Sequence, residues 1–216
     1  MKKVILFAVL ACFLAGLSGG ALWARAGQAR KVLMIVNEYK SADLELMLTK
    51  EVRVMRDLLM QSGFEVIAAT VSGQPLVAGA MTFQPDLKLS DVKAADYAGF
   101  IVPCMAPLEE DPSLDRDAIP IIKDAVAEGK PVAAELGGVT ILAKAGVLSG
   151  KKFAFDKDEV KDVPALKDGV YAGDGVVQDG KIMTSGICPY MAKAKGLQAG
   201  TAALTKALIA ELAIKK

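Results

Sequence analysis

Residues 130–151 read KPVAAELGGVTILAKAGVLSGK, and this stretch combines features of a strand, a tight turn and a helix. Its start, 131–134, is a short apolar run, which is typical of a strand buried on both faces of a parallel sheet. Residues 139–145 have helical spacing and are followed by glycine, which favours the end of a helix. Open α/β sheets bind ligands beyond the carboxyl ends of their strands. We therefore expect a pocket around the residues that join the two elements, Glu135, Leu136, Gly137 and Gly138.

The same alternation continues on both sides of this stretch. The predicted strands are 31–36, 64–71, 99–102 and 131–134, and the predicted helices are 41–62, 117–128, 139–145 and 202–214, with Pro120 in the first turn of the second helix. Within 175–184, the pair Asp179-Gly180 predicts a hairpin with a type I′ turn. Together these elements predict an α/β fold, a doubly wound and mostly parallel sheet sandwiched by helices.

Residues 1–26 have the layout of a secretory signal peptide. Two lysines precede an apolar run, and Ala24-Arg25-Ala26 fits a small-x-small cleavage site. The run is short for a spanning helix, which needs about 20 apolar residues. We expect a periplasmic or secreted protein whose residues 27–216 form a single α/β domain. The alternatives are an uncleaved N-terminal segment that anchors the chain in the membrane, and lipidation at Cys12.

The composition excludes several classes of function. The chain has 26 Lys+Arg, 25 Asp+Glu and no histidine. Without histidine there is no Ser-His-Asp or Cys-His relay and no His-ligated zinc or haem. The near-zero net charge argues against a nucleic-acid partner. The three cysteines lack the paired spacing of a zinc site. We predict no metal and no cofactor.

Four stretches of the chain, taken in order, resemble one known family. They are 31–38 (KVLMIVNE), 85–103 (PDLKLSDVKAADYAGFIVP), 130–151 and 179–185 (DGKIMTS). The chain resembles the ThiJ/PfpI family of the class I glutamine amidotransferase-like superfamily. The resemblance implies a flavodoxin-like fold and a homodimer.

At the catalytic positions, however, the chain departs from the family. The register of the family's nucleophile elbow gives Leu136 where catalytic members have cysteine, and leucine has no nucleophilic atom. The acidic partner falls near Ala42, so Asp43 or Glu45 is expected to reach the pocket. The family's Pro-Gly-Gly turn, which forms the oxyanion pocket, becomes Pro103-Cys104-Met105. The nucleophile, its acidic partner and the oxyanion turn are thus all altered, which favours a non-catalytic or re-purposed pocket.

Three of the joining residues each allow more than one interpretation. Glu135 is a carboxylate bonded to helix-start amides, a ligand-facing or acid–base group, or simply an exposed side chain. Gly137 and Gly138 either permit the tight turn or offer free backbone N–H groups to an anion. The sequence leaves these alternatives open.

Cys104 and Cys188 are the cysteines outside the signal segment. In the resembling fold both follow strands that open toward the same pocket. They form a disulfide, remain two inert buried thiols, or act as a soft-metal or redox-active pair.

The function we expect is that of a pseudoenzyme. It would be an exported ThiJ/PfpI-like domain that lacks the usual nucleophilic cysteine and binds an unknown small molecule or protein. The alternatives are a hydrolase, peptidase or deglycase-type enzyme that uses Cys104 or Cys188, and a redox or metal-handling periplasmic protein.

Overall fold

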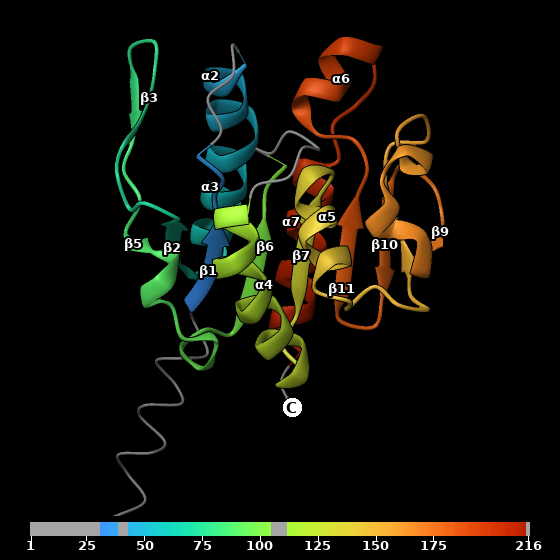
Figure 1. Ribbon diagram of the computed structural model, residues 1–216. Helices are drawn as coiled ribbons and strands as arrows, with labels where there is room; N and C mark the ends of the chain where they lie inside the picture. Colours follow the sequence, from blue (N-terminus) through green and yellow to red (C-terminus); the bar gives the residue numbers. More distant parts are fainter. Residues whose placement is uncertain (1–30, 39–42, 105–111, 215–216) are drawn as a thin grey trace, which may run out of the picture.

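The computed structural model describes residues 31–38, 43–104 and 112–214 (Figure 1). The predictions for the segment 1–26, for Ala42 and for Met105 lie outside these residues. Over the described ranges, no helix combines the length and apolar character needed to cross a membrane.

A seven-stranded sheet forms the centre of the molecule, with strand order β10-β11-β7-β6-β1-β2-β5. Every neighbouring pair is parallel except β10 with β11. This confirms the predicted mostly parallel α/β sheet. The strands are β1 (Lys31–Ile35), β2 (Glu65–Thr70), β5 (Leu87–Lys88), β6 (Gly99–Val102), β7 (Val132–Glu135), β10 (Val176–Asp179) and β11 (Ile182–Ser185).

The central strands are apolar because helices cover both faces of the sheet. Every residue of β6, β7 and β11 is buried, as is β1 after its first residue. In such strands a continuous apolar run replaces the alternating pattern of a half-exposed sheet. Glu135 is the one charged residue in these four strands apart from Lys31, and it stands at the carboxyl end of β7.

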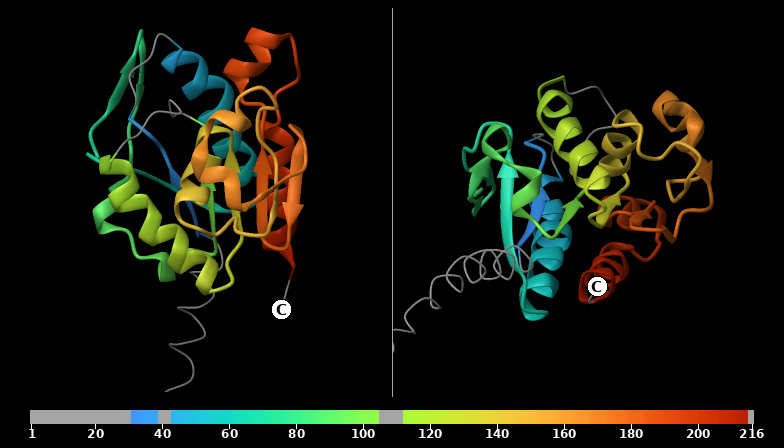
Figure 2. Two further views of the ribbon diagram at one scale, coloured as in Figure 1. Left: turned by 45° about the vertical axis from the view of Figure 1, so that its right-hand side comes forward. Right: turned by 90° about the horizontal axis from the view of Figure 1, so that it is seen from below.

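The helices form two layers, one on each side of the sheet (Figure 2). One layer contains α3 (Arg53–Gln61) and α7 (Thr201–Ala213), which pack against each other, and α7 also packs on β6, β7 and β11. The other contains α4 (Pro112–Ala127) and α5 (Gly137–Lys144), which pack together over β6 and β7. Beyond the carboxyl ends lie α2 (Leu44–Met47) and α6 (Pro189–Lys195), which contact each other.

Two local predictions were wrong in detail. Pro120 lies inside α4, not in its first turn, since α4 occupies Pro112–Ala127. The local cost of such a proline, about 3 kcal/mol, is offset by an apolar face that buries Leu114, Ala118, Ile121, Ile122 and Ala125.

The β10–β11 hairpin is confirmed, but its two-residue loop is Gly180-Lys181. Only Gly180 of that pair has a positive φ, 61°, which is the type II′ arrangement rather than type I′.

The predicted helix at 41–62 is interrupted. A π-helical segment, η1 (Leu48–Val52), separates α2 from α3. A π-turn inserts an extra residue into a helix and often marks a functional site. Here it carries Glu51, a fully buried carboxyl group.

Several short elements were not predicted. They are the edge strand β5, the hairpin β3 (Leu76–Ala78) and β4 (Met81–Phe83), the pair β8 (Lys152–Phe153) and β9 (Val170–Tyr171), helix α6, and the 3-10 turns η2 (Leu89–Asp91), η3 (Ala94–Asp96), η4 (Val160–Asp162) and η5 (Pro164–Asp168). Most contain too few residues to display a period of apolar positions.

Candidate functional site

The turn between β7 and α5, which we call the elbow, is strained. Leu136 has φ 36° and ψ −99°, and among the described residues it is the only non-glycine residue with positive φ. Its N–H donates to the carbonyl of Ser185 over 2.7 Å, and its own carbonyl accepts from Val139 over 2.8 Å. Strain of this kind costs about 1–3 kcal/mol and gathers at functional sites. The Leu136 side chain is buried.

The two glycines of the elbow have structural tasks. A Cβ on Gly138 would collide with the carbonyl oxygen of Val102 and stand 3.0 Å from that of Pro103, so only glycine lets α5 begin against the end of β6. The Gly137 N–H donates to Cys104 Sγ over 3.4 Å. Gly138 thus permits the tight turn, and the Gly137 N–H is already bonded within the protein.

Glu135 is fully buried, so the interpretation of it as an exposed side chain is wrong. Its carboxyl group accepts hydrogen bonds from side-chain hydroxyls: Ser185 Oγ donates to Oε1 over 3.2 Å, and Thr201 Oγ1 donates to Oε2 over 2.8 Å. These donors come from the end of β11 and the start of α7 rather than from the amides of α5. A Cβ on Gly200 would collide with Ser185 Oγ, so glycine there leaves room for this arrangement.

A second buried carboxyl group, Glu51, lies beside Glu135. Glu51 Oε1 accepts the Cys104 N–H over 2.6 Å. Two carboxylates cannot bond to each other because both are acceptors, and with both ionised Glu51 Oε2 has no partner in the described part of the chain. A proton held between the two groups provides the hydrogen bond that links them.

The pKa values of the two carboxyl groups agree with one shared proton. Burial, and then the charge and hydrogen bond of Glu135, raise the pKa of Glu51 well above its ordinary value. Burial raises the pKa of Glu135 to about 7, although its hydrogen bonds with Glu51, Thr201 and Ser185 act in the opposite direction. One proton therefore stays on the pair at neutral pH.

Cys104 and Cys188 meet at the same place. Cys104 follows β6, Cys188 is the N-cap residue of α6, and both are free and buried. Their side chains are hydrogen-bonded to each other. We call Glu51, Cys104, Glu135 and Cys188 the acid–thiol cluster.

The two thiols differ in acidity. The hydrogen bond with Cys188, followed by burial, raises the pKa of Cys104 well above its ordinary value. The same bond lowers the pKa of Cys188, and the backbone N–H groups of Met191 and Tyr190 act in the same direction against burial. Cys188 is therefore the sulfur that ionises first.

The other predicted site residues lie elsewhere. Asp43 Oδ1 pairs with Lys193 Nζ on α6 at 3.6 Å, and the Glu45 carboxylate lies against Gly79 of the β3–β4 turn. The acid that reaches the thiols is Glu51, which the sequence analysis missed. Its sequence signal is a charged residue at helical spacing from Met47 and Met55, and therefore on the apolar face of the predicted helix.

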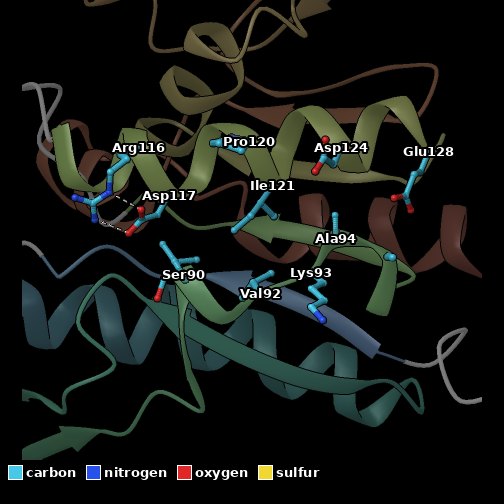
Figure 3. A pocket seen from close by; sticks show the side chains of 12 residues that line it. Ser90, Val92, Lys93, Ala94, Arg116, Asp117, Pro120, Ile121, Asp124 and Glu128 are labelled. Carbon is cyan, nitrogen blue, oxygen red and sulfur yellow. Dashed lines mark hydrogen bonds and ion pairs between the residues drawn. The ribbon is translucent and has the colours of Figure 1, made fainter.

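A surface cavity lies away from the cluster. An open surface cavity of about 520 Å³ runs along α4, with the Arg116–Asp117 ion pair toward one end and Glu128 toward the other (Figure 3). In the described ranges, no group of three or more Cys, Asp or Glu side chains is arranged to hold a metal ion.

Comparison with known proteins identifies the family. Residues 30–193 match the DJ-1/PfpI family. An uncharacterised protein of Archaeoglobus fulgidus is 30% identical over 158 residues, which is 72% of this chain and 88% of that protein. A ThiJ/PfpI domain protein from Brachyspira murdochii superposes with a TM-score of 0.63 at 15% identity, covering 86% of this chain and 98% of that one. Drosophila melanogaster DJ-1beta gives a TM-score of 0.56 at 21% identity, covering 87% and 99%. The chain belongs to the DJ-1/PfpI family.

Proposed function

We propose that this protein is an exported member of the DJ-1/PfpI family that has lost the elbow nucleophile and binds a small molecule or protein partner at the carboxyl ends of the sheet. The observation that carries the proposal is Leu136 on the strained elbow. Such a turn presents the side chain on which nucleophilic catalysis depends. Leucine offers no atom that could form a covalent intermediate there.

The neighbouring backbone donors support the same proposal. Stabilising a developing oxyanion needs N–H groups that are free to face it. Here the Cys104 N–H donates to Glu51 and the Gly137 N–H donates to Cys104 Sγ. Each donor is thus occupied by a group of the protein itself.

Assays on glyoxalase, deglycase and peptidase substrates test the proposal, with a heat-inactivated sample as blank. We expect the wild type to be inactive. Leu136→Cys restores a sulfur but not the donors, and loss of one oxyanion donor alone costs about 10²–10³ in turnover, so this variant should remain poor. Turnover by the wild type that survives Leu136→Ala would overturn the proposal.

A thiol enzyme is the second candidate, because the hydrogen bond with Cys104 lowers the pKa of Cys188, although burial and the charge of Glu135 act in the opposite direction. A hydrolase, peptidase or deglycase-type enzyme of this kind would use Cys188 or Cys104 as nucleophile. The same assays separate the two candidates. Activity in the wild type that disappears in Cys104→Ser/Cys188→Ser would assign catalysis to the thiols.

A further inference from the structure

The topology of the sheet brings the two thiols together. β6 and β11 are the two neighbours of β7, and all three strands are parallel. Their carboxyl ends therefore lie at one edge. Cys104 follows the end of β6 and Cys188 follows the end of β11, so the two cysteines lie at the edge of the sheet where β7 also ends.

Polar contacts hold both sulfur atoms in place. The thiols are hydrogen-bonded to each other, Cys104 Sγ also accepts the Gly137 N–H over 3.4 Å, and the backbone N–H groups of Tyr190 and Met191 face Cys188. Two inert thiols would need only apolar packing. A thiol that ionises readily beside one that stays protonated is instead the combination that thiol–disulfide exchange uses.

We propose that Cys104 and Cys188 form a redox-active dithiol, which a low-molecular-weight disulfide oxidises to an intramolecular disulfide across the end of β7. The Cys188 thiolate attacks one sulfur of the small disulfide, breaks its S–S bond and releases the first small thiolate. Cys104 then loses its proton and attacks Cys188 Sγ, which forms the Cys104–Cys188 bond and releases the second. The two small thiolates take up the two protons that the cysteines lose. The protein is oxidised by two electrons and the small disulfide is reduced to two thiols.

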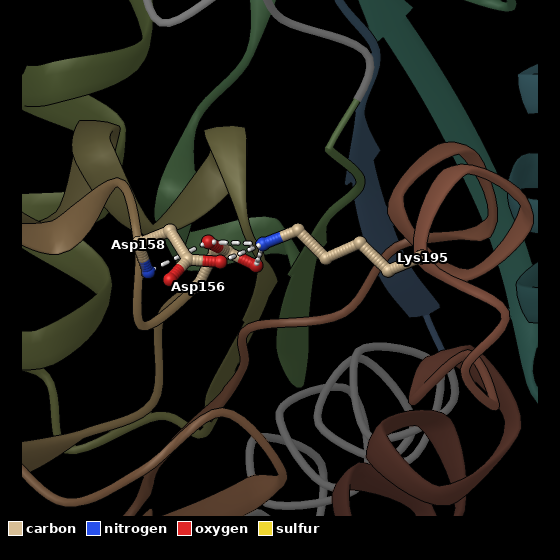
Figure 4. Close-up of polar contacts among 3 residues, drawn as sticks. All are labelled: Asp156, Asp158 and Lys195. Carbon is tan, nitrogen blue, oxygen red and sulfur yellow. Dashed lines mark hydrogen bonds and ion pairs between the residues drawn. The ribbon is translucent and has the colours of Figure 1, made fainter.

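A small disulfide reaches the buried thiols only when the structure around them opens locally. Cys104 is 6% exposed and Cys188 is 1% exposed. Cys188 precedes α6, whose last residue, Lys195, is held by Asp156 and Asp158 of the loop after β8 (Figure 4). Opening of α6 therefore limits the rate of the exchange, whereas the equilibrium depends on the two sulfurs.

The test uses the full native chain carrying Cys12→Ser, so that Cys104 and Cys188 are the two thiols that remain. The protein is equilibrated in glutathione buffers of increasing oxidised fraction, quenched with an alkylating reagent and weighed intact. We expect a species that is lighter than the reduced protein by two hydrogen atoms and carries no alkyl label, with a Cys104–Cys188 link in its peptide map. Dithiothreitol should return both thiols.

Controls separate this dithiol from incidental oxidation. In Cys104→Ser or Cys188→Ser the remaining thiol can form only a mixed disulfide with glutathione, and the internal link should be absent. If both thiols of the native protein stay reduced in fully oxidised buffer, or if the link forms only in denaturant, the proposal is wrong. The result does not depend on the proposed function, because Leu136 takes no part in the exchange.

Discussion

Glu51 and Glu135 make the stability of the protein depend on pH in an unusual direction. Surface carboxyl groups in ion pairs have lowered pKa values and lose their stabilising effect as the pH falls. The pKa values of these two groups are raised by burial, that of Glu135 to about 7. Their contribution is complete below about pH 4.3, the ordinary value for glutamate, and is lost as the pH rises through 7.

We predict that Glu51→Gln flattens this dependence. A glutamine can accept the Cys104 N–H and donate to Glu135 without a shared proton. Between pH 5 and pH 8 the free energy of unfolding should fall less in the variant than in the wild type, because only Glu135 still titrates with a raised pKa. The fall that remains in the variant should be on the order of 3 kcal/mol, and that of the wild type should be larger by the contribution of Glu51. Urea unfolding at both pH values measures the difference. The surface variant Glu65→Gln should follow the wild type, and a Glu51→Gln curve parallel to the wild type would contradict the prediction.

At the scale of elements, the elbow fixes how β7, α5 and β6 fit together. Replacing a helical glycine by alanine normally stabilises a protein by up to about 1 kcal/mol. At Gly138 we expect the opposite, a loss of more than about 2 kcal/mol, because the new Cβ meets the backbone of Val102 and Pro103. Thermal or urea unfolding measures the loss. Gly175→Ala is the matched control, since a Cβ there meets nothing within 4 Å and it should be neutral or mildly stabilising. Equal effects at the two sites would contradict this prediction.

Helix α6 is held by a small number of polar contacts. Lys195 Nζ lies 2.6 Å from Asp156 Oδ2 and 2.7 Å from Asp158 Oδ2, and Asp156 is buried. We predict that Lys195→Met loosens α6 and speeds alkylation of Cys188 several-fold in native buffer, because the buried Asp156 loses its cation. Lys193→Met is the control, since its 3.6 Å contact with Asp43 is exposed. Alkylation at the wild-type rate in Lys195→Met would mean that α6 does not limit access.

The central strands could be predicted from the sequence, whereas helix α6 and the buried acid Glu51 could not. The central strands were predictable because burial on both faces demands continuous apolar runs, as in 99–102 and 131–134. Helix α6 was missed because only Pro189 and Met191 are buried in it. Glu51 was not predicted because the register of the family pointed to Asp43 and Glu45, whereas the buried acid of the structure is Glu51 in the π-helical segment η1.

At the scale of the whole molecule, export stays a prediction. The Lys-Lys, apolar-run and Ala-Arg-Ala layout of 1–26 predicts a mature chain that begins near Gly27. N-terminal sequencing of the protein from its native host measures this. An intact Met1 on protein recovered from the cytoplasm would contradict it, and an intact Met1 in the membrane fraction would support the uncleaved anchor.

We also predict that the mature protein forms a homodimer, as its family suggests. Exposed apolar side chains that could contribute to an interface include Val77, Tyr190 and Leu197. Light scattering at micromolar concentration should give twice the mass of one chain. A single-chain mass over the whole concentration range would contradict the prediction.

The position of β7 between β6 and β11 has a consequence for proteolysis. In the oxidised form, the Cys104–Cys188 bond would close a covalent loop of the chain that contains α4, β7, α5 and β10. A protease that cut the surface turns η4 or η5 once would then leave both fragments covalently joined. Such a nicked protein should run as one band on a non-reducing gel and as two after reduction, so its resistance to fragmentation would vary with the redox state of its surroundings.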